Sequence, residues 1–154
     1  MTGQPAYCVD LRRMEEFSAV ELYALLKLRV DVFIVEQACV YPELDGKDAD
    51  ALHLRLFVDG ETAAYARLWQ PLNGPPRIGR VIVAPAHRGR KLGEALMREA
   101  IRACDTHFPA MSIAISAQRH LQHFYASLGF LPSSDAYIED GIPHIDMLRT
   151  AESH

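Results

Sequence analysis

Apolar residues at helical spacing predict the first helix of the chain. They recur on one helical face and are Leu22, Leu25, Leu26 and Phe33. Ser18 and Glu21 form an S-x-x-E capping box just before them, which is the signature of a helix N-terminus. Arg29 lies within this apolar face, so we expect its guanidinium to reach solvent, to form an internal salt bridge, or to meet an anionic ligand.

Alternating apolar and polar residues predict a β-hairpin in the middle of the chain. Residues 52–58 alternate as a half-buried strand, an Asp-Gly pair at residues 59–60 makes a two-residue turn, and residues 62–69 return as the partner strand. Tyr65 and Trp69 share one face of this returning strand. Their rings either pack in the core or line a substrate cleft.

Strands and helices continue in mixed order after this hairpin. The further elements are a strand over residues 78–83, a helix over 92–104, a strand over 111–116, a helix over 118–128 and two strands around residues 140–141. The helix over 92–104 has an apolar half that includes Cys104, and Gly129 is a stop signal for the next helix. This order predicts a mixed α/β fold, and 154 residues suit a single domain over residues 1–154.

Composition argues against several classes of protein. With 49% hydrophobic and 23% charged residues, the chain is typical of a globular domain, and no apolar run approaches the ~18 residues of a transmembrane helix. A net charge of −4 argues against nucleic-acid binding. The three cysteines include no C-x-x-C pair, so neither a disulfide framework nor a zinc ribbon is expected. We expect a cytoplasmic protein, monomeric or homodimeric, that binds neither nucleic acid nor membrane.

Charged residues are unevenly distributed along the chain. Residues 77–102 carry seven Lys and Arg against two Glu, whereas residues 31–50 carry six acidic residues against Lys47. The basic segment suggests an anionic ligand, and the acidic segment could attract a cationic one. Both segments could equally be solvated faces of the protein.

The basic segment contains a junction between a strand and a helix. The strand ends before Pro85, and three cations stand where the helix begins, namely Arg88, Arg90 and Lys91. Cations are unfavourable there, because the free N–H groups and the dipole of a helix N-terminus attract anions. A bound polyphosphate resolves this conflict, and Gly89 and Gly93 allow the backbone to approach it closely. The alternative is an exposed loop with incidental arginines.

The junction resembles the acetyl-CoA loop of the GNAT superfamily of N-acetyltransferases, written [RQ]-x-x-G-x-[GA]. Arg88, Leu92 and Gly93 fit this pattern, while Lys91 stands where the middle glycine is usual. A later family motif, N-x(6)-Y-x(3)-G-F, is matched by three residues, namely Tyr125, Gly129 and Phe130. In that motif Gln118 replaces the asparagine.

Further segments are similar to the ElaA-type branch of this superfamily. They are Leu28-Arg29 with Val32-Phe33, Val35-Glu36-Gln37, residues 41–48 and residues 139–144. The likeness covers nearly the whole chain and implies the GNAT fold, a mixed and mostly antiparallel sheet flanked by helices. It also implies that the sheet is splayed between its fourth and fifth strands, with acetyl-CoA, the cosubstrate, in that gap.

The resemblance implies a set of cofactor-binding residues. The backbone of Val81, Ile82 and Val83 would hold the pantetheine arm and polarise the thioester carbonyl. The loop residues would hold the pyrophosphate, and they are Arg88, Gly89, Arg90, Lys91, Leu92 and Gly93. Gln118 would also bind the cofactor.

Acetyl transfer to a primary amine also requires proton transfers. The resemblance implies direct attack of the amine in a ternary complex, with Tyr125 as the general acid for the departing sulfur; the alternative is a core tyrosine. The candidates for the base are Glu36 in the acidic segment, His144, whose ordinary pKa of about 6.5 suits the task, and Glu139. A water relay would also serve as the base.

Other interpretations stay open on the sequence alone. The chain could be a non-catalytic regulatory protein that binds CoA or acyl-CoA. Arg29 and Phe33 are also similar to residues of acyl-homoserine-lactone synthases, whose full signature is absent. His120 and His123 are spaced like metal ligands, but they have no third ligand, so we assign no metal site. The acceptor could be a small-molecule or peptide amine.

Overall fold

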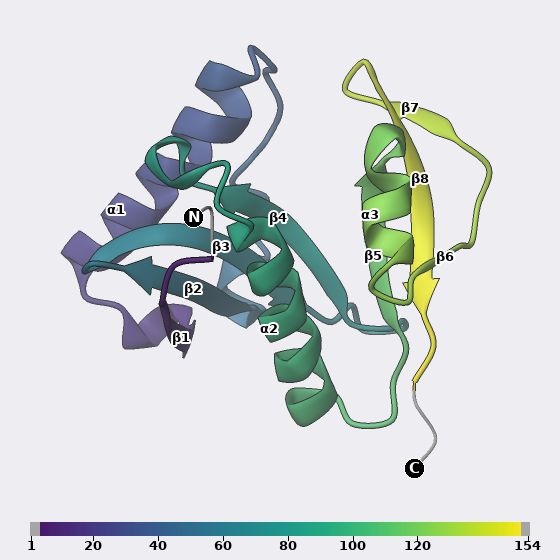
Figure 1. Cartoon of the computed structure of the whole chain (residues 1–154), viewed down its shortest axis with the longest axis horizontal. Coiled ribbons are helices and arrows are strands. Elements are labelled where there is room, and N and C mark those ends of the chain that lie inside the picture. Colours follow the sequence, from purple (N-terminus) through teal and green to yellow (C-terminus); the bar gives the residue numbers. More distant parts are fainter. Residues whose placement is uncertain (1–3, 152–154) are drawn as a thin grey trace.

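The structure, a computed structural model, describes residues 4–151, which form an open β-sheet flanked by helices (Figure 1). The strands are β1 (Cys8–Arg13), β2 (Leu52–Val58), β3 (Glu61–Trp69), β4 (Arg77–Val83), β5 (Ile113–Gln118), β6 (Leu131–Pro132), β7 (Tyr137–Glu139) and β8 (Ile142–Arg149). The helices are α1 (Ala19–Val30), α2 (Leu92–His107) and α3 (Gln122–Ala126), and a π-helical segment, η2 (Asp31–Glu36), extends α1. The 3-10 turns are η1 (Met14–Glu16), η3 (Asp48–Asp50), η4 (Pro85–His87) and η5 (Arg119–Leu121). None of the helices in this described range is long and apolar enough to cross a membrane.

The sheet divides into two halves at its centre. The strand order is β1-β2-β3-β4-β5-β8-β6, with β7 paired to β8, and every pair is antiparallel except β4 with β5. That parallel pair meets only at Arg77 and Ala114, and the two strands diverge from there (Figure 1). The predicted fold is therefore confirmed, including the splay between the fourth and fifth strands.

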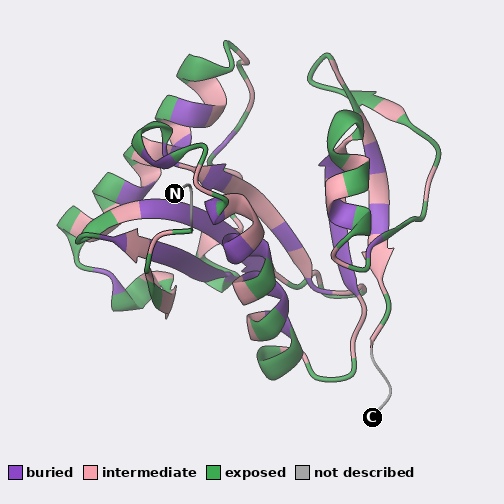
Figure 2. Cartoon of the chain, viewed as in Figure 1, coloured by how far each residue is buried: buried purple, intermediate pink, exposed green. Residues whose placement is uncertain are grey.

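Helices cover both faces of the half-sheet formed by β1 to β4. Helix α2 packs on one face, against a core that includes Leu54, Leu56, Leu68, Leu96, Met97 and Ala100. Helix α1 and η2 cover the opposite face, where Leu25 and Val32 pack with Tyr65 and Ile82. Because both faces are covered, β2 is buried along nearly its whole length rather than at alternate residues only (Figure 2).

Most predicted elements form near their predicted positions, with one clear error. The hairpin of β2 and β3 and the helix α2 are present, and Cys104 is buried in α2. The helix predicted over residues 118–128 is wrong in its first part, because β5 continues to Gln118 and η5 follows, so α3 has five residues. Gly129 follows with φ +96°, as the stop signal predicted. Strands β1 and β6 were not predicted.

Arg29 is a fully buried cation on the apolar face of α1. Its Nε donates to Oε1 of Glu43 at 2.6 Å, and its Nη1 donates to Oδ1 of Asp48 at 2.7 Å. Both carboxylates are themselves largely removed from solvent. Of the alternatives for Arg29, the internal salt bridge is confirmed.

The acidic segment supplies partners for two further arginines. Arg67 makes a bidentate pair with Asp45, at 2.9 and 2.8 Å, and also donates to Asp48 at 3.1 Å. We call the resulting cluster the arginine network; its members are Arg29, Arg67, Arg80, Glu43, Asp45 and Asp48. The expectation of a free acidic face over residues 31–50 is wrong for these three carboxylates, because they neutralise arginines of the same chain.

We expect Arg29→Met to destabilise the fold strongly. The substitution leaves Glu43 and Asp48 without their buried partner, and loss of one member of a buried ion pair costs about 3–5 kcal/mol. The free energy of unfolding, measured by urea denaturation, checks this. Lys27→Met is the matched control in the same helix, because the ion pair of Lys27 with Asp31 is exposed and should contribute less than ~1 kcal/mol. Equal small losses in both variants would contradict the stabilising role of the network.

Candidate active site

The divergence of β4 from β5 coincides with a cavity of about 520 Å³, which we call the central cavity. It lies between β4, β5 and the segment of residues 37–47 that follows η2. Its wall includes Trp69 of β3, Gln118 of β5 and His144 of β8. The central cavity therefore brings together residues from both halves of the sheet.

Strand β4 is irregular where it borders the central cavity. Tyr65 of β3 pairs with Ile82, but Arg67, two residues further on, pairs with Gly79, so β4 holds one extra residue in between. Arg80 lies in this β-bulge with φ +53°, a left-handed conformation that is uncommon for a residue with a side chain. A bulge of this kind leaves the extra residue without a ladder partner.

The side chains at the end of β4 pack into the two cores. Val81 and Val83 pack against the core beneath α2, whereas Ile82 packs with the residues of α1 and η2. Since β5 pairs with β4 only at Arg77, the remaining edge of β4 presents backbone N–H and C=O groups to the gap. Backbone groups of this kind require a hydrogen-bonding partner, either water or a ligand.

The arginine network holds the side chain of Arg80 at the bulge. The Nη2 atom of Arg80 donates to the carbonyl oxygen of Glu43 at 2.9 Å and to Oδ2 of Asp45 at 3.3 Å. Its guanidinium also lies 5.5 Å from the ring centroid of Tyr41. These contacts hold Arg80 in its left-handed conformation. Their partners all lie in residues 41–45, which form the opposite wall of the cavity.

Strand β4 continues through η4 into the basic loop and helix α2. Gly89 has φ +79°, and Lys91, immediately before α2, has φ +60°. The left-handed conformation costs a residue with a side chain roughly 1–2 kcal/mol but costs glycine little. Lys91 therefore occupies a position suited to glycine. No side chain within residues 4–151 caps α2, so the N–H groups of its first turn are available to an anion.

Arg88 and Glu36 face each other across this loop. The two side chains form a bidentate ion pair, with both N–O distances at 2.7 Å, and Arg88 also donates from Nε to the carbonyl oxygen of Val83. The hydrogen bonds from Arg88 lower the pKa of Glu36. Both side chains are more than two-fifths exposed, so the pair is accessible to a competing anion. The structure thus joins a predicted phosphate-binding residue to a predicted base.

Tyr125 of α3 is nine-tenths buried in the core between α2 and β5. Its ring makes edge contacts with Phe124 and Phe130, with centroids 5.1 and 6.2 Å away. Burial raises the pKa of its hydroxyl, which therefore stays protonated at neutral pH. Across residues 4–151, no group lies within hydrogen-bonding distance of that hydroxyl. The hydroxyl is thus a donor without a partner in this range, and Tyr125 is not among the residues that line the central cavity.

His144 lies at the edge of the central cavity in a defined tautomer. Its Nδ1 is 2.8 Å from the carbonyl oxygen of Ile142, which can only accept, so Nδ1 carries the proton of the neutral ring. The lone pair then belongs to Nε2, which lies 3.9 Å from Oε2 of Glu139. Gln118 pairs with His144 across β5 and β8 and lines the same cavity. Two of the predicted bases therefore lie together at this cavity.

The two aromatic residues predicted on one face of β3 have separate environments. Tyr65 is fully buried, and its hydroxyl is 2.7 Å from Nδ1 of His53, so it does not line the cavity. Trp69 does line it, and Nζ of Lys47 lies 4.5 Å from the centroid of the indole ring. Sequence reasoning missed Lys47 and Arg77 as cavity residues, because no local pattern indicates which cations a folded sheet will bring together.

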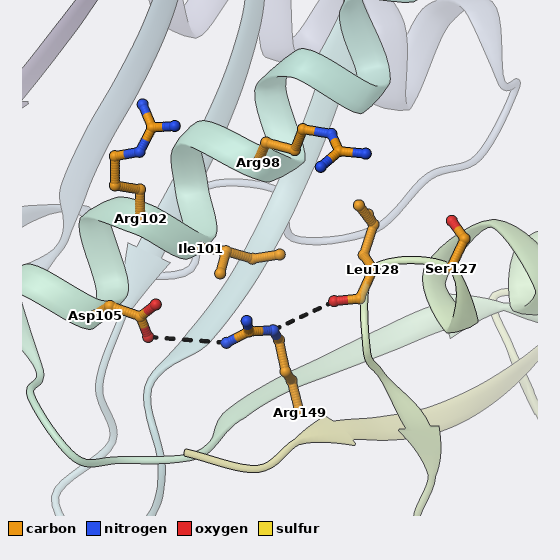
Figure 3. Close-up of a pocket in the computed structure, with 7 residues that line it drawn as sticks. All are labelled: Arg98, Ile101, Arg102, Asp105, Ser127, Leu128 and Arg149. Carbon is orange, nitrogen blue, oxygen red and sulfur yellow. Dashed lines mark hydrogen bonds and ion pairs between the residues drawn. The ribbon is translucent and has the colours of Figure 1, made fainter. Parts of the chain in front are cut away.

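A second cavity, of about 350 Å³, lies between α2 and the end of α3. Arg149 spans it, donating to the carbonyl oxygen of Leu128 and lying 3.9 Å from Asp105 (Figure 3). Arg98 and Arg102, also on its wall, pair with glutamates of their own helix. None of the residues assigned to catalysis or cofactor binding lines this second cavity.

Comparison with known proteins shows which family this chain is similar to. The family model described as an acetyltransferase (GNAT) domain matches residues 18–151. ElaA of Escherichia coli strain K12 is 46% identical over 138 residues, which span 87% of this chain and 90% of that protein. The comparison therefore confirms the predicted superfamily and its ElaA-type branch.

Solved structures agree with this assignment. An acyl-CoA N-acyltransferase from Pseudomonas aeruginosa superimposes with a TM-score of 0.89 at 41% identity, over 94% of this chain and all of that chain. Escherichia coli ElaA has a TM-score of 0.88 at 42% identity, over 94% and 99% of the two chains. A GNAT family acetyltransferase from Elizabethkingia anophelis, solved with acetyl-CoA bound, shares the fold at 15% identity, with a TM-score of 0.66 over 96% and 98%.

The carboxylates of the arginine network predict a loss of stability in acid. Burial opposes the ionisation of Asp45 and Asp48, but hydrogen bonds from Arg67 and Arg29 outweigh it and lower the pKa of each carboxyl. A carboxyl of this kind stabilises the fold fully above its unfolded pKa of about 3.9, and the gain disappears as the pH falls through the lower folded value.

We therefore expect the free energy of unfolding to fall as these carboxyls become protonated, from about pH 5 downward through their lowered folded pKa values. Urea denaturation at a series of pH values measures this fall. Asp45→Asn removes one of these carboxyls, so the free energy of unfolding of this variant should fall less in acid than that of the unmodified chain. If the free energy of unfolding fell equally steeply in acid for this variant and for the unmodified chain, Asp45 would not contribute to the pH dependence as stated.

Proposed function

Because this chain belongs to the acetyltransferase (GNAT) family, we propose that it transfers the acetyl group of acetyl-CoA to a primary amine by direct attack in a ternary complex. The observation that carries the proposal is the free backbone edge of β4. This edge begins at the central cavity and leads into the basic loop at the start of α2. A single ligand lying along it could reach both places.

The residues around the gap fit the parts of acetyl-CoA. Amide groups of the pantetheine arm match the edge of β4 that β5 leaves open at residues Val81, Ile82 and Val83, as an added strand would, although Arg88 already donates to the carbonyl oxygen of Val83. The pyrophosphate requires N–H donors and cations, which the uncapped start of α2 and the loop residues from Arg88 to Gly93 would supply. Acetyl-CoA supplies the activated acetyl group, and the chain supplies binding, orientation and proton transfer.

His144 is the residue best supported as the general base. An alkylammonium has a pKa near 10.4, so only about one molecule in a thousand is neutral at pH 7 and a proton acceptor is needed. The lone pair of Nε2 on His144 is fixed by the hydrogen bond at Nδ1. Glu139, whose Oε2 lies 3.9 Å from this Nε2, would attract the ammonium group of the acceptor. The proton would pass to His144 directly or through one water molecule.

Glu36 is less well supported as a base, since its bidentate pair with Arg88 stabilises the ionised carboxylate and lowers its pKa. We infer instead that Glu36 holds Arg88 until the pyrophosphate competes for the guanidinium. Tyr125 would act at the other side of the reaction, as donor to the departing sulfur, because its hydroxyl is protonated and has no partner in residues 4–151. Gln118 would contact the cofactor from the end of β5.

A binding and turnover experiment tests the proposed function. Calorimetric titration with acetyl-CoA should give saturable binding, and at least one primary amine should be acetylated with release of one thiol per product. In Tyr125→Phe the loss of a general acid should lower kcat by about 100-fold or more while acetyl-CoA still binds. Binding of acetyl-CoA without turnover on any amine would favour the regulatory alternative and overturn the proposal.

The pair of Arg88 and Glu36 gives opposite expectations for two substitutions. Arg88→Gln removes a charge-assisted contact to phosphate and should raise the Kd for CoA about tenfold. Glu36→Gln releases Arg88 from an exposed ion pair and should leave Kd equal or lower it by up to about fivefold. Arg98→Gln, at an exposed arginine in the middle of α2, serves as the control. A large fall in kcat for Glu36→Gln, at constant CoA affinity, would instead identify Glu36 as the base.

A further inference from the structure

The arginine network is balanced by its own residues. Three arginines and three carboxylates make it up, and each arginine is within 4.0 Å of two of the carboxylates. Arg67, Arg80 and Asp45 line the central cavity but belong to this network. Their charges therefore compensate one another and leave little net charge for a ligand.

Two other cations of the central cavity have no such compensation. Lys47 and Arg77 both line the cavity and are half-buried, and no carboxylate of residues 4–151 lies within 4.0 Å of either side chain. Lys47 rests over the ring of Trp69, and Arg77 is the partner of Trp69 in the ladder between β3 and β4. Both cations therefore lie beside Trp69, at the same end of the cavity. A partly desolvated pair of like charges favours an anion between them.

The opposite end of the cavity has the opposite charge. Glu139 and Asp140 belong to the β7–β8 hairpin and line the cavity next to His144. Along β5, Ala114 pairs with Arg77 and Gln118 pairs with His144. Four residues of strand separate these positions, which is about 13 Å at roughly 3.3 Å per residue. The cationic and anionic ends therefore lie well apart, with the free edge of β4 between them.

We propose that the acceptor carries a carboxylate as well as the amine, and that Lys47 and Arg77 bind this carboxylate beside Trp69 while the amine lies near His144 and Glu139. This inference rests on the proposed function, since it specifies the acceptor of the same reaction. The separation of the two ends favours an amine several bonds away from the carboxylate, as in an ω-amino acid or the side-chain amine of free lysine. A neutral amine or a polyamine would leave both cations uncompensated.

Matched substrates of equal size test this inference. We compare 6-aminohexanoate with 6-aminohexanamide, which differ in charge at the far end but not in length, in the steady-state acetylation assay. The carboxylate should raise kcat/KM at least tenfold, and shorter chains, 4-aminobutanoate and glycine, should lose this gain progressively. The 5-aminopentylphosphonate analogue shows whether the site accepts any anion or a carboxylate in particular.

Substitutions at the two cations should remove the preference. Lys47→Met and Arg77→Met should each lower kcat/KM for 6-aminohexanoate about tenfold while changing kcat/KM for 6-aminohexanamide less than about twofold. Lys27→Met, an exposed cation of α1 outside the cavity, is the control and should leave the ratio of the two substrates unchanged. Lys47→Gln repeats the test with a polar side chain, in case the methionine variant folds poorly.

Binding in the presence of CoA separates this inference from the proposed function. Calorimetry with 6-aminohexanoate should give a Kd that rises about tenfold in Lys47→Met. If this holds but no amine is acetylated, the proposed function fails and the carboxylate site stands. If amines are acetylated but the acid and the amide are equivalent in every variant, the inference fails and the proposed function stands. Absence of both binding and turnover overturns both.

Discussion

The single residue pair between β4 and β5 is the constraint on which the site depends. Backbone N–H and C=O groups of a central strand are normally satisfied by both neighbouring strands. Here β4 has one neighbour over most of its length, since β5 diverges after Arg77 and Ala114. The sheet therefore contains an internal edge, although the core beneath α2 includes residues from both halves. A ligand that hydrogen-bonds like a strand completes this edge, and acetyl-CoA has such groups.

The arginine network links this edge to the rest of the fold. Removing these arginines and carboxylates from water costs desolvation energy that offsets much of the gain from their ion pairs, whereas deleting one member leaves the others unpaired and is strongly destabilising. The network as a whole therefore contributes more to the position of its segment than to net stability. Arg29 fixes Glu43 and Asp48 against α1, and these in turn secure the segment that holds Arg80 in its left-handed conformation. The same segment forms one wall of the central cavity. The ion pairs of the arginine network therefore connect helix α1 to the wall of the central cavity.

Local patterns predicted most of the elements, but not the residues that contact one another across them. The Asp-Gly turn and the alternation around it predicted the hairpin of β2 and β3, and the cations beside Pro85 predicted the loop before α2. The partners of Arg29 lie 14 and 19 residues further along the chain, and no periodicity indicates them. The left-handed conformation of Arg80 and the cavity position of Arg77 depend on where β5 diverges. Gln118 was predicted to begin a helix over residues 118–128, whereas it ends strand β5.

Hydrogen exchange of the backbone amides, measured with and without CoA, tests the central claim most directly. The account predicts slower exchange in the presence of CoA for the amides of residues 81–83 and 88–93, with β1 at the far edge of the sheet unchanged. Protection limited to these segments would mean that the ligand completes the edge of β4 and occupies the start of α2. Protection elsewhere in the chain, with exchange at β4 and the loop unaltered, would contradict the account.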